Sequence, residues 1–284
     1  MTILHGMRVF ESSAFVALPL AGMQLAQMGA EVIRFDNLGG GLDHLRRPLA
    51  PNGESLFWHG LNKGKKSFAV NLKTEKGREL VTDLITSDGD DAGLFITNLR
   101  VAGWTDYESL KRKRADLIMV TLKGDRHGGP EVDYTVNPSL GIPHITGAEG
   151  STEPVANALP AWDCVAGNMV VSSLLAAERD RLRTGRGQDV EFALKDAAAA
   201  VIGHLGMIGE ATIYDQQRGK SGNSVYGAYG QDFECACGGR VVVIGLTLRQ
   251  WRGLLKATDK AQEIKNLEQK LNISLDDEGH RWEH

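Results

Sequence analysis

Residues 160–196 read PAWDCVAGNMVVSSLLAAERDRLRTGRGQDVEFALKD and predict a long helix, a strand and the start of a second helix. Apolar side chains recur at helical spacing, and Gly185 stands where the first helix is expected to end. Residues 190–194 then alternate apolar and polar side chains, as in a half-buried strand. The second helix is predicted to continue to Tyr214.

Asp163 lies at the start of the long helix, directly after the apolar segment Leu159-Pro-Ala-Trp. We predict it as the helix N-cap, because a carboxylate there accepts backbone N–H groups and meets the positive end of the helix dipole. These contacts also predict a carboxylate that stays ionised at neutral pH. From the local sequence, Asp163 is either a cap alone or a nucleophile.

Strands and helices alternate along the chain on both sides of this stretch. The expected strands are 7–11, 31–36, 67–72, 93–98 and 117–122, and the helices are 19–28, 107–114 and one capped by Thr74. This order predicts a Rossmann-like α/β fold, a parallel sheet with flanking helices that binds ligands at the carboxyl ends of its strands. No Gly-x-Gly-x-x-Gly joins a strand to a helix, so the nicotinamide fingerprint is absent.

The character of the sequence changes after residue 214. Residues 215–230 are polar and rich in glycine, and a hairpin followed by two charged helices is expected after them. We therefore predict a large domain over 1–214, a linker over 215–230 and a smaller α+β domain over 231–284.

Composition limits the class of protein. The 284 residues are 42% apolar and 24% charged, and the net charge of −4 argues against a general nucleic-acid binder. No apolar run reaches 18 residues and no signal sequence is visible, so no membrane association and a cytoplasmic location are expected. The three cysteines, Cys164, Cys235 and Cys237, do not have the spacing of a zinc site, and no metal is predicted.

Several segments together resemble the family III CoA-transferases. In that family an aspartate precedes a long helix that ends in Thr-Gly-Arg-Gly-Gln, as Asp163 and Thr184-Gly-Arg-Gly-Gln do here, and similar segments extend from residue 6 to about residue 255. The resemblance implies the family's fold, an interlocked homodimer, a CoA thioester as substrate and no prosthetic group. Family chains continue beyond the position of His284, so a truncated form of the fold, without the C-terminal return segment, is expected.

The resemblance also implies roles for single residues. Asp163 matches the family's nucleophile, which attacks a thioester. Contacts to CoA are implied for residues at the ends of strands and in the loop after the first one: Val16, Ala17, Leu72, Lys73, Asn98, Leu99, Arg100 and Lys123. Basic side chains at strand ends suit the phosphates of CoA. Lys63, Lys65 and Lys66 are instead expected on a solvated face.

Further segments, including Gly41-Leu-Asp-His-Leu-Arg-Arg and Glu131-Val-Asp-Tyr-Thr-Val-Asn-Pro, resemble family members that move CoA between the C1 and C4 carboxyl groups of mesaconyl-CoA. The implied mechanism passes through an aspartyl-CoA thioester. An intermolecular CoA-transferase acting on a dicarboxylic acid, a racemase of 2-methylacyl-CoA and an inactive, truncated CoA-binding domain remain as alternatives.

The free end of a dicarboxylate needs a cation, and the loop with His44, Arg46 and Arg47 is a candidate for supplying it. An anhydride intermediate also needs protection from water. We expect Trp162 and Phe15 to form that apolar wall.

Overall fold

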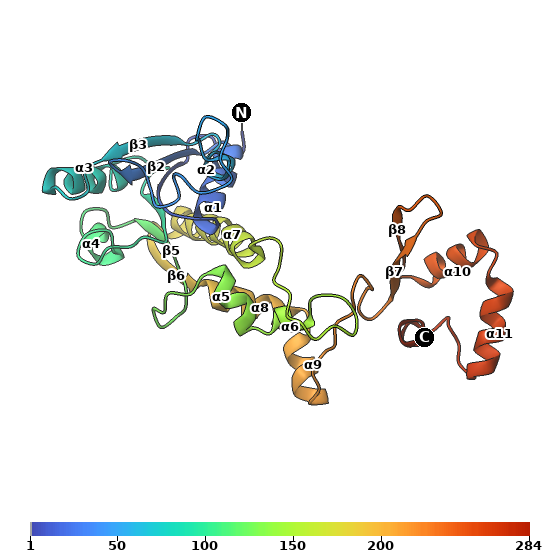
Figure 1. The fold of residues 1–284 in the computed structure, drawn as a ribbon. Helices are drawn as coiled ribbons and strands as arrows, with labels where there is room; N and C mark the ends of the chain where they lie inside the picture. The colour runs from blue at the N-terminus through green and yellow to red at the C-terminus, as the bar shows by residue number, and fades with distance from the viewer. Residues whose placement is uncertain (1) are drawn as a thin grey trace. The chain divides into compact units, whose positions relative to one another are not determined.

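The computed structural model describes residues 2–284, which form two compact units (Figure 1). The first unit extends to Leu140 and includes Asn157–Asp215, and the second combines Gly141–Ala156 with Gln216–His284. The domain limits expected from the sequence stay a prediction. The observed units differ from them in the segment 141–156, which groups with the C-terminal residues.

Six parallel strands form the sheet of the first unit, in the order β3-β2-β1-β4-β5-β6. They are β1 (Arg8–Ser12), β2 (Glu31–Asn37), β3 (Lys66–Val70), β4 (Leu94–Thr97), β5 (Ile118–Lys123) and β6 (Gln188–Ala193). The helices of this unit are α1 (Ala17–Gln27), α2 (Leu56–Leu61), α3 (Glu75–Ile85), α4 (Tyr107–Lys111), α5 (Asp133–Ser139), α7 (Ala161–Thr184), α8 (Leu194–His204) and α9 (Met207–Tyr214). The predicted fold class is confirmed. The strand order reverses between β1 and β4, which is where such sheets bind ligands.

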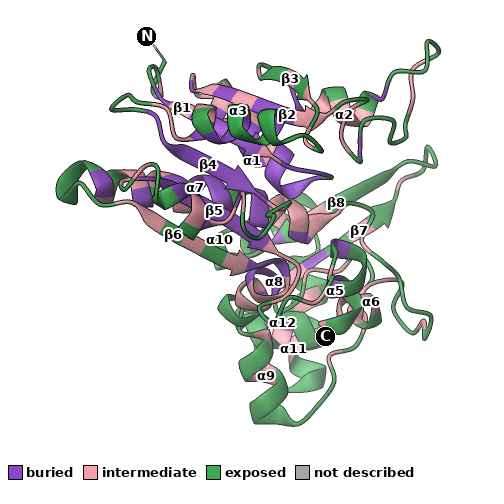
Figure 2. Ribbon diagram, turned by 90° about the vertical axis from the view of Figure 1, so that its left-hand side faces the viewer, coloured by how far each residue is buried: buried purple, intermediate pink, exposed green. Residues whose placement is uncertain are grey.

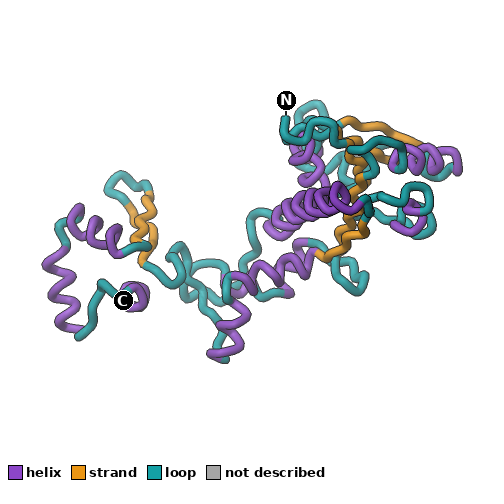
Figure 3. Tube along the Cα trace, turned by 180° about the vertical axis from the view of Figure 1, so that it is seen from behind, coloured by secondary structure: helices purple, strands orange, loops and turns teal. Residues whose placement is uncertain are grey.

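Helices cover both faces of the sheet (Figure 3). On one face, aromatic and apolar side chains of the strands pack against α3 and α4: Phe10, Phe35, Phe95 and Met119 meet Val81, Ile85, Tyr107 and Leu110. Alternate strand residues point to the opposite face, where α1 and α7 lie side by side. The central strands β4 and β5 are coloured as buried in Figure 2. Burial of each large apolar side chain contributes about 1.5–3 kcal/mol, so the apolar residues between the sheet and its helices stabilise this unit strongly.

Glycines end helices in two places in this unit. Gly185 follows α7 with φ 69°, as predicted. The expected single helix to Tyr214 is wrong, because Gly206 adopts φ 80° and the chain breaks into α8 and α9. Across residues 2–284 no single helix is long and apolar enough to cross a membrane, and α8 with α9 reaches that length and composition only as a pair bent by 67°.

The second unit contains a short hairpin and small helices: α6 (Ile142–Ile145), β7 (Tyr229–Glu234), β8 (Arg240–Gly245), α10 (Leu248–Ala257), α11 (Ala261–Leu271) and α12 (Glu278–Glu283). The predicted hairpin is confirmed, with antiparallel pairing from Tyr229–Gly245 to Glu234–Arg240. Its core is small. The Trp251 ring centroid lies 5.1 Å from that of Tyr229, and Val242 of β8 stays exposed.

Candidate active site

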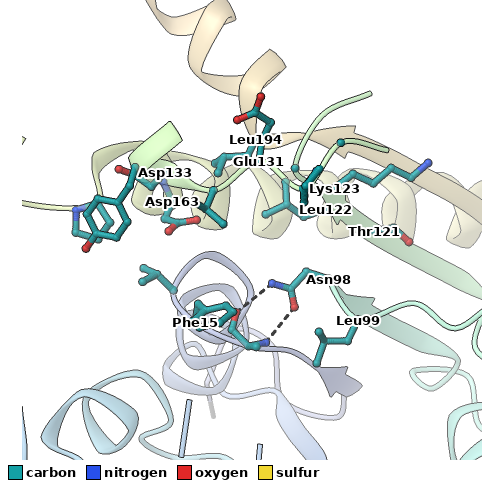
Figure 4. A pocket seen from close by; sticks show the side chains of 18 of the residues that line it. Phe15, Asn98, Leu99, Thr121, Leu122, Lys123, Glu131, Asp133, Asp163 and Leu194 are labelled. Atoms are coloured by element: carbon teal, nitrogen blue, oxygen red, sulfur yellow. Dashed lines mark hydrogen bonds between the residues drawn. The ribbon is translucent and has the colours of Figure 1, made fainter. Parts of the chain in front are cut away.

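A cavity of about 760 Å³ lies in the first unit at the carboxyl ends of β1, β4 and β5, beside the start of α7 (Figure 4). Its lining comes from three loops after strands, from the loop before α2, and from the beginnings of α5, α7 and α8. The lining residues are Ala14, Phe15, Val16, Arg46, Arg47, Phe57, Asn98, Leu99, Arg100, Thr121, Leu122, Lys123, Gly124, Gly128, Gly129, Pro130, Glu131, Val132, Asp133, Tyr134, Pro160, Asp163 and Leu194.

Six of the nine residues predicted for the site line this cavity: Val16, Asn98, Leu99, Arg100, Lys123 and Asp163. Ala17 is buried in the first turn of α1 and does not line it. Leu72 and Lys73 follow β3, the edge strand two positions from β1, and also lie outside the lining. Leu72 packs against the apolar core below α3, whereas Lys73 is exposed.

The predicted N-cap role of Asp163 is wrong. Helix α7 begins at Ala161 after Pro160, so Asp163 is the third helical residue, and the cap residue makes no side-chain hydrogen bond. Asp133 of α5 takes the capping role instead. One oxygen of its carboxylate, Oδ2, accepts the backbone N–H groups of Trp162 at 2.8 Å and of Asp163 at 3.1 Å.

The charge state expected for Asp163 is also wrong. Burial and the neighbouring Asp133 carboxylate raise the pKa of Asp163 to about 7, and only the Arg46 guanidinium opposes this rise. Within residues 2–284 the Asp163 carboxylate accepts no backbone or side-chain hydrogen bond that would favour the ionised form. A buried carboxylate that titrates near neutrality at a cavity wall is a functional-site candidate.

The loop after β1 forms the wall opposite Asp163. Asn98, the residue directly after β4, holds this loop: Ala14 N–H donates to Asn98 Oδ1, and Asn98 Nδ2 donates to the Ala14 carbonyl, both at 3.0 Å (Figure 4). Phe15 adopts φ 70°, the left-handed region that side chains rarely occupy, and its N–H donates to Asp43 Oδ2 at 2.8 Å. Strain of this kind persists only where the surroundings hold it.

A buried ionic cluster supports that loop from behind. Its members are Glu11, Arg34, Asp36, Asp43 and Lys65. Arg34 donates to Asp43 Oδ1 at 3.1 Å, and Lys65 Nζ donates to Glu11 Oε1 at 2.8 Å. The expectation that Lys65 is solvated is therefore wrong, since its side chain is 1% exposed.

Arg46 also lines the cavity. It lies in the loop before α2, and it is neither at the end of a strand nor part of the buried ionic cluster. Its guanidinium lies over the rings of Phe15 and Phe57, 5.5 and 5.1 Å from the centroids. No ion pair joins Arg46 or Arg47 to a carboxylate within the described chain. The two aromatic rings therefore hold a positive charge in the same cavity as Asp163.

Two other predicted contributors to the site lie elsewhere. His44 packs edge-on against Trp58 and does not line the cavity. Trp162 is buried with its indole N–H donating to Asn137 at 2.9 Å, so it does not form the apolar wall expected of it. Phe15, the other half of that wall, lines the cavity.

The other end of the cavity is polar. Arg100 after β4 and Lys123 of β5 both form ion pairs with Glu191 of β6. The buried hydroxyl of Thr121, also on β5, has no hydrogen-bond partner among the described residues and lines the same cavity. Nowhere in residues 2–284 do three or more His, Cys, Asp or Glu side chains gather as a metal site would require.

Chemically, this arrangement combines an ionisable carboxylate in a cavity with a nearby cation, Arg46, and two further basic side chains at the far end. A carboxylate of this kind can act as a nucleophile toward an acyl group. Cations at the ends of parallel strands can hold a phosphorylated carrier.

A cavity at the carboxyl ends of parallel strands, with a buried carboxylate at one end and basic side chains at the other, is the kind of site that acyl-transfer enzymes use, and sequence comparison identifies the family. The chain belongs to CoA-transferase family III, an enzyme family whose sequence profile matches residues 4–278. A 2-methylfumaryl-CoA isomerase of Chloroflexus aurantiacus is 56% identical over 281 residues, an alignment that covers 99% of this chain and 69% of the relative.

Other relatives agree on the family. A succinate–glutarate CoA-transferase of Agrobacterium fabrum is 34% identical over 222 residues, which cover 72% of this chain and 54% of that protein. The crystal structure of a CAIB/BAIF family protein from Brucella suis superposes with a TM-score of 0.76 at 27% identity, covering 90% of this chain and 69% of the other.

Sequence reasoning missed Asp133, Glu191 and Phe57. Asp133 stands four residues before Asn137, a spacing that places both on one face of a helix, and this was the available signal. Glu191 offered none, because an acidic residue in an alternating strand is usually a solvated one.

Proposed function

We propose that the protein moves CoA between the C1 and C4 carboxyl groups of mesaconyl-CoA, which is 2-methylfumaryl-CoA, through an aspartyl-CoA thioester at Asp163. The observation that carries this proposal is the position of Asp163 in the cavity wall, with its carboxylate left without hydrogen bonds from other described residues. The 56% identical relative carries the name of the corresponding isomerase, which favours this acyl group.

The reaction needs four substitutions at carbonyl carbon. The Asp163 carboxylate attacks the C1 thioester, the C–S bond breaks, and CoA leaves as a thiolate with an aspartyl–mesaconyl anhydride behind it. The thiolate attacks the aspartyl carbonyl and releases the C1 carboxylate. The C4 carboxylate then attacks the aspartyl thioester, and the thiolate finally attacks the C4 carbonyl. Asp163 is regenerated and no proton or electron is consumed.

The acid must turn in the cavity without leaving it. Retention makes the second half of the reaction intramolecular, with the high effective concentration that this brings. Arg46 supplies a cation for the carboxylate that is not reacting, in the same cavity as Asp163. Phe15 and Phe57 hold that cation and exclude water from the anhydride.

The phosphate groups of CoA would bind at the end of the cavity away from Asp163, where Arg100 and Lys123 lie. We propose that Arg100 and Lys123 exchange their Glu191 partner for CoA phosphate oxygens, and that Val16, Asn98 and Leu99 line the path of the pantetheine arm. Ala17, Leu72 and Lys73 are assigned to CoA by family resemblance alone, since none of them lines the cavity.

A second candidate is intermolecular transfer between an acyl-CoA and a free dicarboxylic acid, which the 34% identical succinate–glutarate CoA-transferase favours. Incubation of mesaconyl-C1-CoA with the protein and no added acid separates the two. Mass spectrometry and NMR should find mesaconyl-C4-CoA without deuterium uptake from D₂O. Conversion only after acid is added would support the intermolecular reaction. A racemase needs a separate incubation, because C2 of mesaconyl-C1-CoA carries no hydrogen: a saturated 2-methylacyl-CoA would exchange its α-hydrogen for deuterium in D₂O.

Asp163→Asn tests the nucleophile. The variant should lose at least 10⁴-fold in rate, about 5.4 kcal/mol of barrier, because an amide does not displace a thiolate. The stability of the folded variant should not decrease. The folded-state pKa of Asp163, about 7, lies above the unfolded value of about 3.9, so stability falls as pH rises from about 4 to about 7. Asp163→Asn should therefore melt no lower than the wild type at pH 8, and near-wild-type activity in it would disprove the proposal.

A further inference from the structure

The start of α7 depends on another helix. Four backbone N–H groups at a helix start lack partners within the helix, and a side chain directly before it usually accepts one of them. Here the preceding residue is Pro160, whose side chain accepts none. Asp133, 3% exposed, accepts two of these N–H groups with one oxygen, at 2.8 and 3.1 Å.

Helix α5 makes a second hydrogen bond to Trp162. Asn137, one turn after Asp133, accepts the indole N–H of Trp162 at 2.9 Å and an amide N–H of Asn157 at 3.1 Å. Trp162 is thus bound at its backbone and at its ring by two side chains four residues apart. The backbone directly before and at Asp163 is fixed in position and in direction.

These contacts determine what Asp163 can do. An aspartate in the first helical turn ordinarily competes for the unpaired N–H groups, and a carboxylate bound to them would be ionised, fixed and turned away from a ligand. Asp133 occupies that role, and Asp163 accepts no hydrogen bond from the rest of the described chain. Figure 4 shows both carboxylates at the same end of the cavity.

We propose that Asp133 is a positioning residue for the transfer reaction: it caps α7 in place of Asp163 and thereby leaves the Asp163 carboxylate directed into the cavity to meet the thioester. This inference rests on the proposed function of Asp163. Asp133 itself has both N–H contacts on one oxygen and is not required to touch the substrate.

The charge of Asp133 has a second effect, on the pH at which Asp163 is ionised. Asp133 disfavours the Asp163 anion and Arg46 favours it. Other titratable groups are near. Arg47, Glu131 and Tyr134 line the same cavity and Cys164 adjoins Asp163, but only Asp133 and Arg46 shift the pKa of Asp163 through their charge. Helix α1 carries no titratable side chain, and Lys195 and Asp196 of α8 form ion pairs with Glu131 and Arg126. Ionised Asp163 is the nucleophile, so the rate should fall as pH drops through its pKa.

Asp133→Asn and Asp133→Ala separate the two effects. Asp133→Asn keeps an oxygen acceptor for the two N–H groups but loses the charge, so kcat at pH 8 should stay within about 3-fold of the wild type while the acid limb of kcat/KM moves from near pH 7 to lower pH. Asp133→Ala loses the acceptor, and kcat should fall about 10- to 100-fold with KM changed by less than about 3-fold. Asp196→Asn, at the start of α8 and outside the cavity lining, is the matched control.

A direct readout does not depend on turnover. The ¹³C resonance of the Asp163 carboxyl group should titrate at a lower pH in Asp133→Asn than in the wild type and at an unchanged pH in Asp196→Asn. If Asp133→Asn leaves both the titration and the acid limb unchanged, the charge of Asp133 does not act on Asp163. If Asp133→Ala folds and keeps the wild-type kcat, the positioning role is wrong. Where Asp133→Ala fails to fold, a fall in kcat at pH 8 far beyond about 3-fold in Asp133→Asn would contradict the claim that an oxygen acceptor at this position is enough. If Asp163→Asn is active, the proposed function fails instead, and the carboxyl titration still reports whether Asp133 acts on Asp163.

Discussion

Two groups of ion pairs in the first unit use the same kinds of side chain in opposite ways. The cluster behind the Phe15 loop is buried, with Arg34 and Glu11 at 1% and 0% exposure. The pairs of Arg100 and Lys123 with Glu191 lie at the cavity mouth, about a third exposed. The first group fixes the backbone of the Phe15 loop, whereas the second remains accessible to solvent.

The difference arises from solvation. Charges removed from water must be matched almost completely, and taking one away leaves its partners uncompensated. Charges at a surface are screened, and their pairing contributes little. The exchange proposed for Arg100 and Lys123 is therefore compatible with their exposed position, whereas the ion pair that holds Asp43 against the Phe15 N–H lies in the interior.

The largest expected effect is a loss of stability when the buried ionic cluster is disrupted. Arg34→Ala leaves Asp36 and Asp43 without their cation and Glu11 with Lys65 alone, and should lower the free energy of unfolding by about 3–5 kcal/mol in chemical denaturation. Arg8→Ala, on the neighbouring strand, breaks an exposed pair with Glu31 and should cost less than about 1 kcal/mol. Equal losses in the two variants would contradict the comparison.

Arg46 differs from the cations of both groups, because it forms no ion pair with a carboxylate in the described chain. Arg46→Gln should raise KM for mesaconyl-CoA about 10- to 100-fold, because a charge-assisted contact to the free carboxylate contributes about 1.5–3 kcal/mol. The effect should be small for a monocarboxylic acyl-CoA of the same size. If both thioesters are affected alike, Arg46 does not recognise the second carboxylate.

Smaller losses are expected at the cavity mouth. Arg100→Gln and Lys123→Gln should each weaken binding of CoA about 3- to 10-fold at low salt, with the difference shrinking at high salt. Isothermal titration with CoA measures this. Lys73→Gln, beyond the cavity lining, provides the comparison and should change affinity by less than about 2-fold if CoA does not extend to β3.

The smallest effect, and one of opposite sign, is expected for Glu191→Gln. Removal of this carboxylate frees both cations for a phosphate, so CoA should bind up to about 3-fold more tightly, while unfolding changes by less than about 1 kcal/mol. Weaker binding by this variant would mean that Glu191 organises the two cations instead of competing for them.

Local patterns predicted the parts of this fold that local physics controls. The Thr74 cap is present, with its hydroxyl accepting the Gly77 N–H at 3.2 Å, and Gly185 ends α7 as its backbone freedom suggests. Alternating strands and helices were enough to anticipate a parallel sheet. The homodimer and the limits of the domains stay predictions.

What the sequence could not provide was set by contacts across distance. Asp133 and Trp162 are 29 residues apart in the chain, so no local rule could indicate that another helix caps α7. For the same reason the pKa of Asp163 was misjudged, since burial in the folded chain raises it most and the distant residue Asp133 raises it further. Lys65 looked like a solvated lysine because its partner Glu11 is 54 residues away.

Because Asp133 of α5 caps α7, the stability of this helix does not depend on which side chain stands at the reactive position 163. Because α5 secures the first turn, the helix does not need a carboxylate at position 163, and a side chain of different reactivity could stand there without unravelling it. Serine or cysteine in place of Asp163 would meet the same cavity from the same backbone. A protein built in this way offers an interchangeable reactive position, both to natural divergence and to anyone redesigning its catalysis.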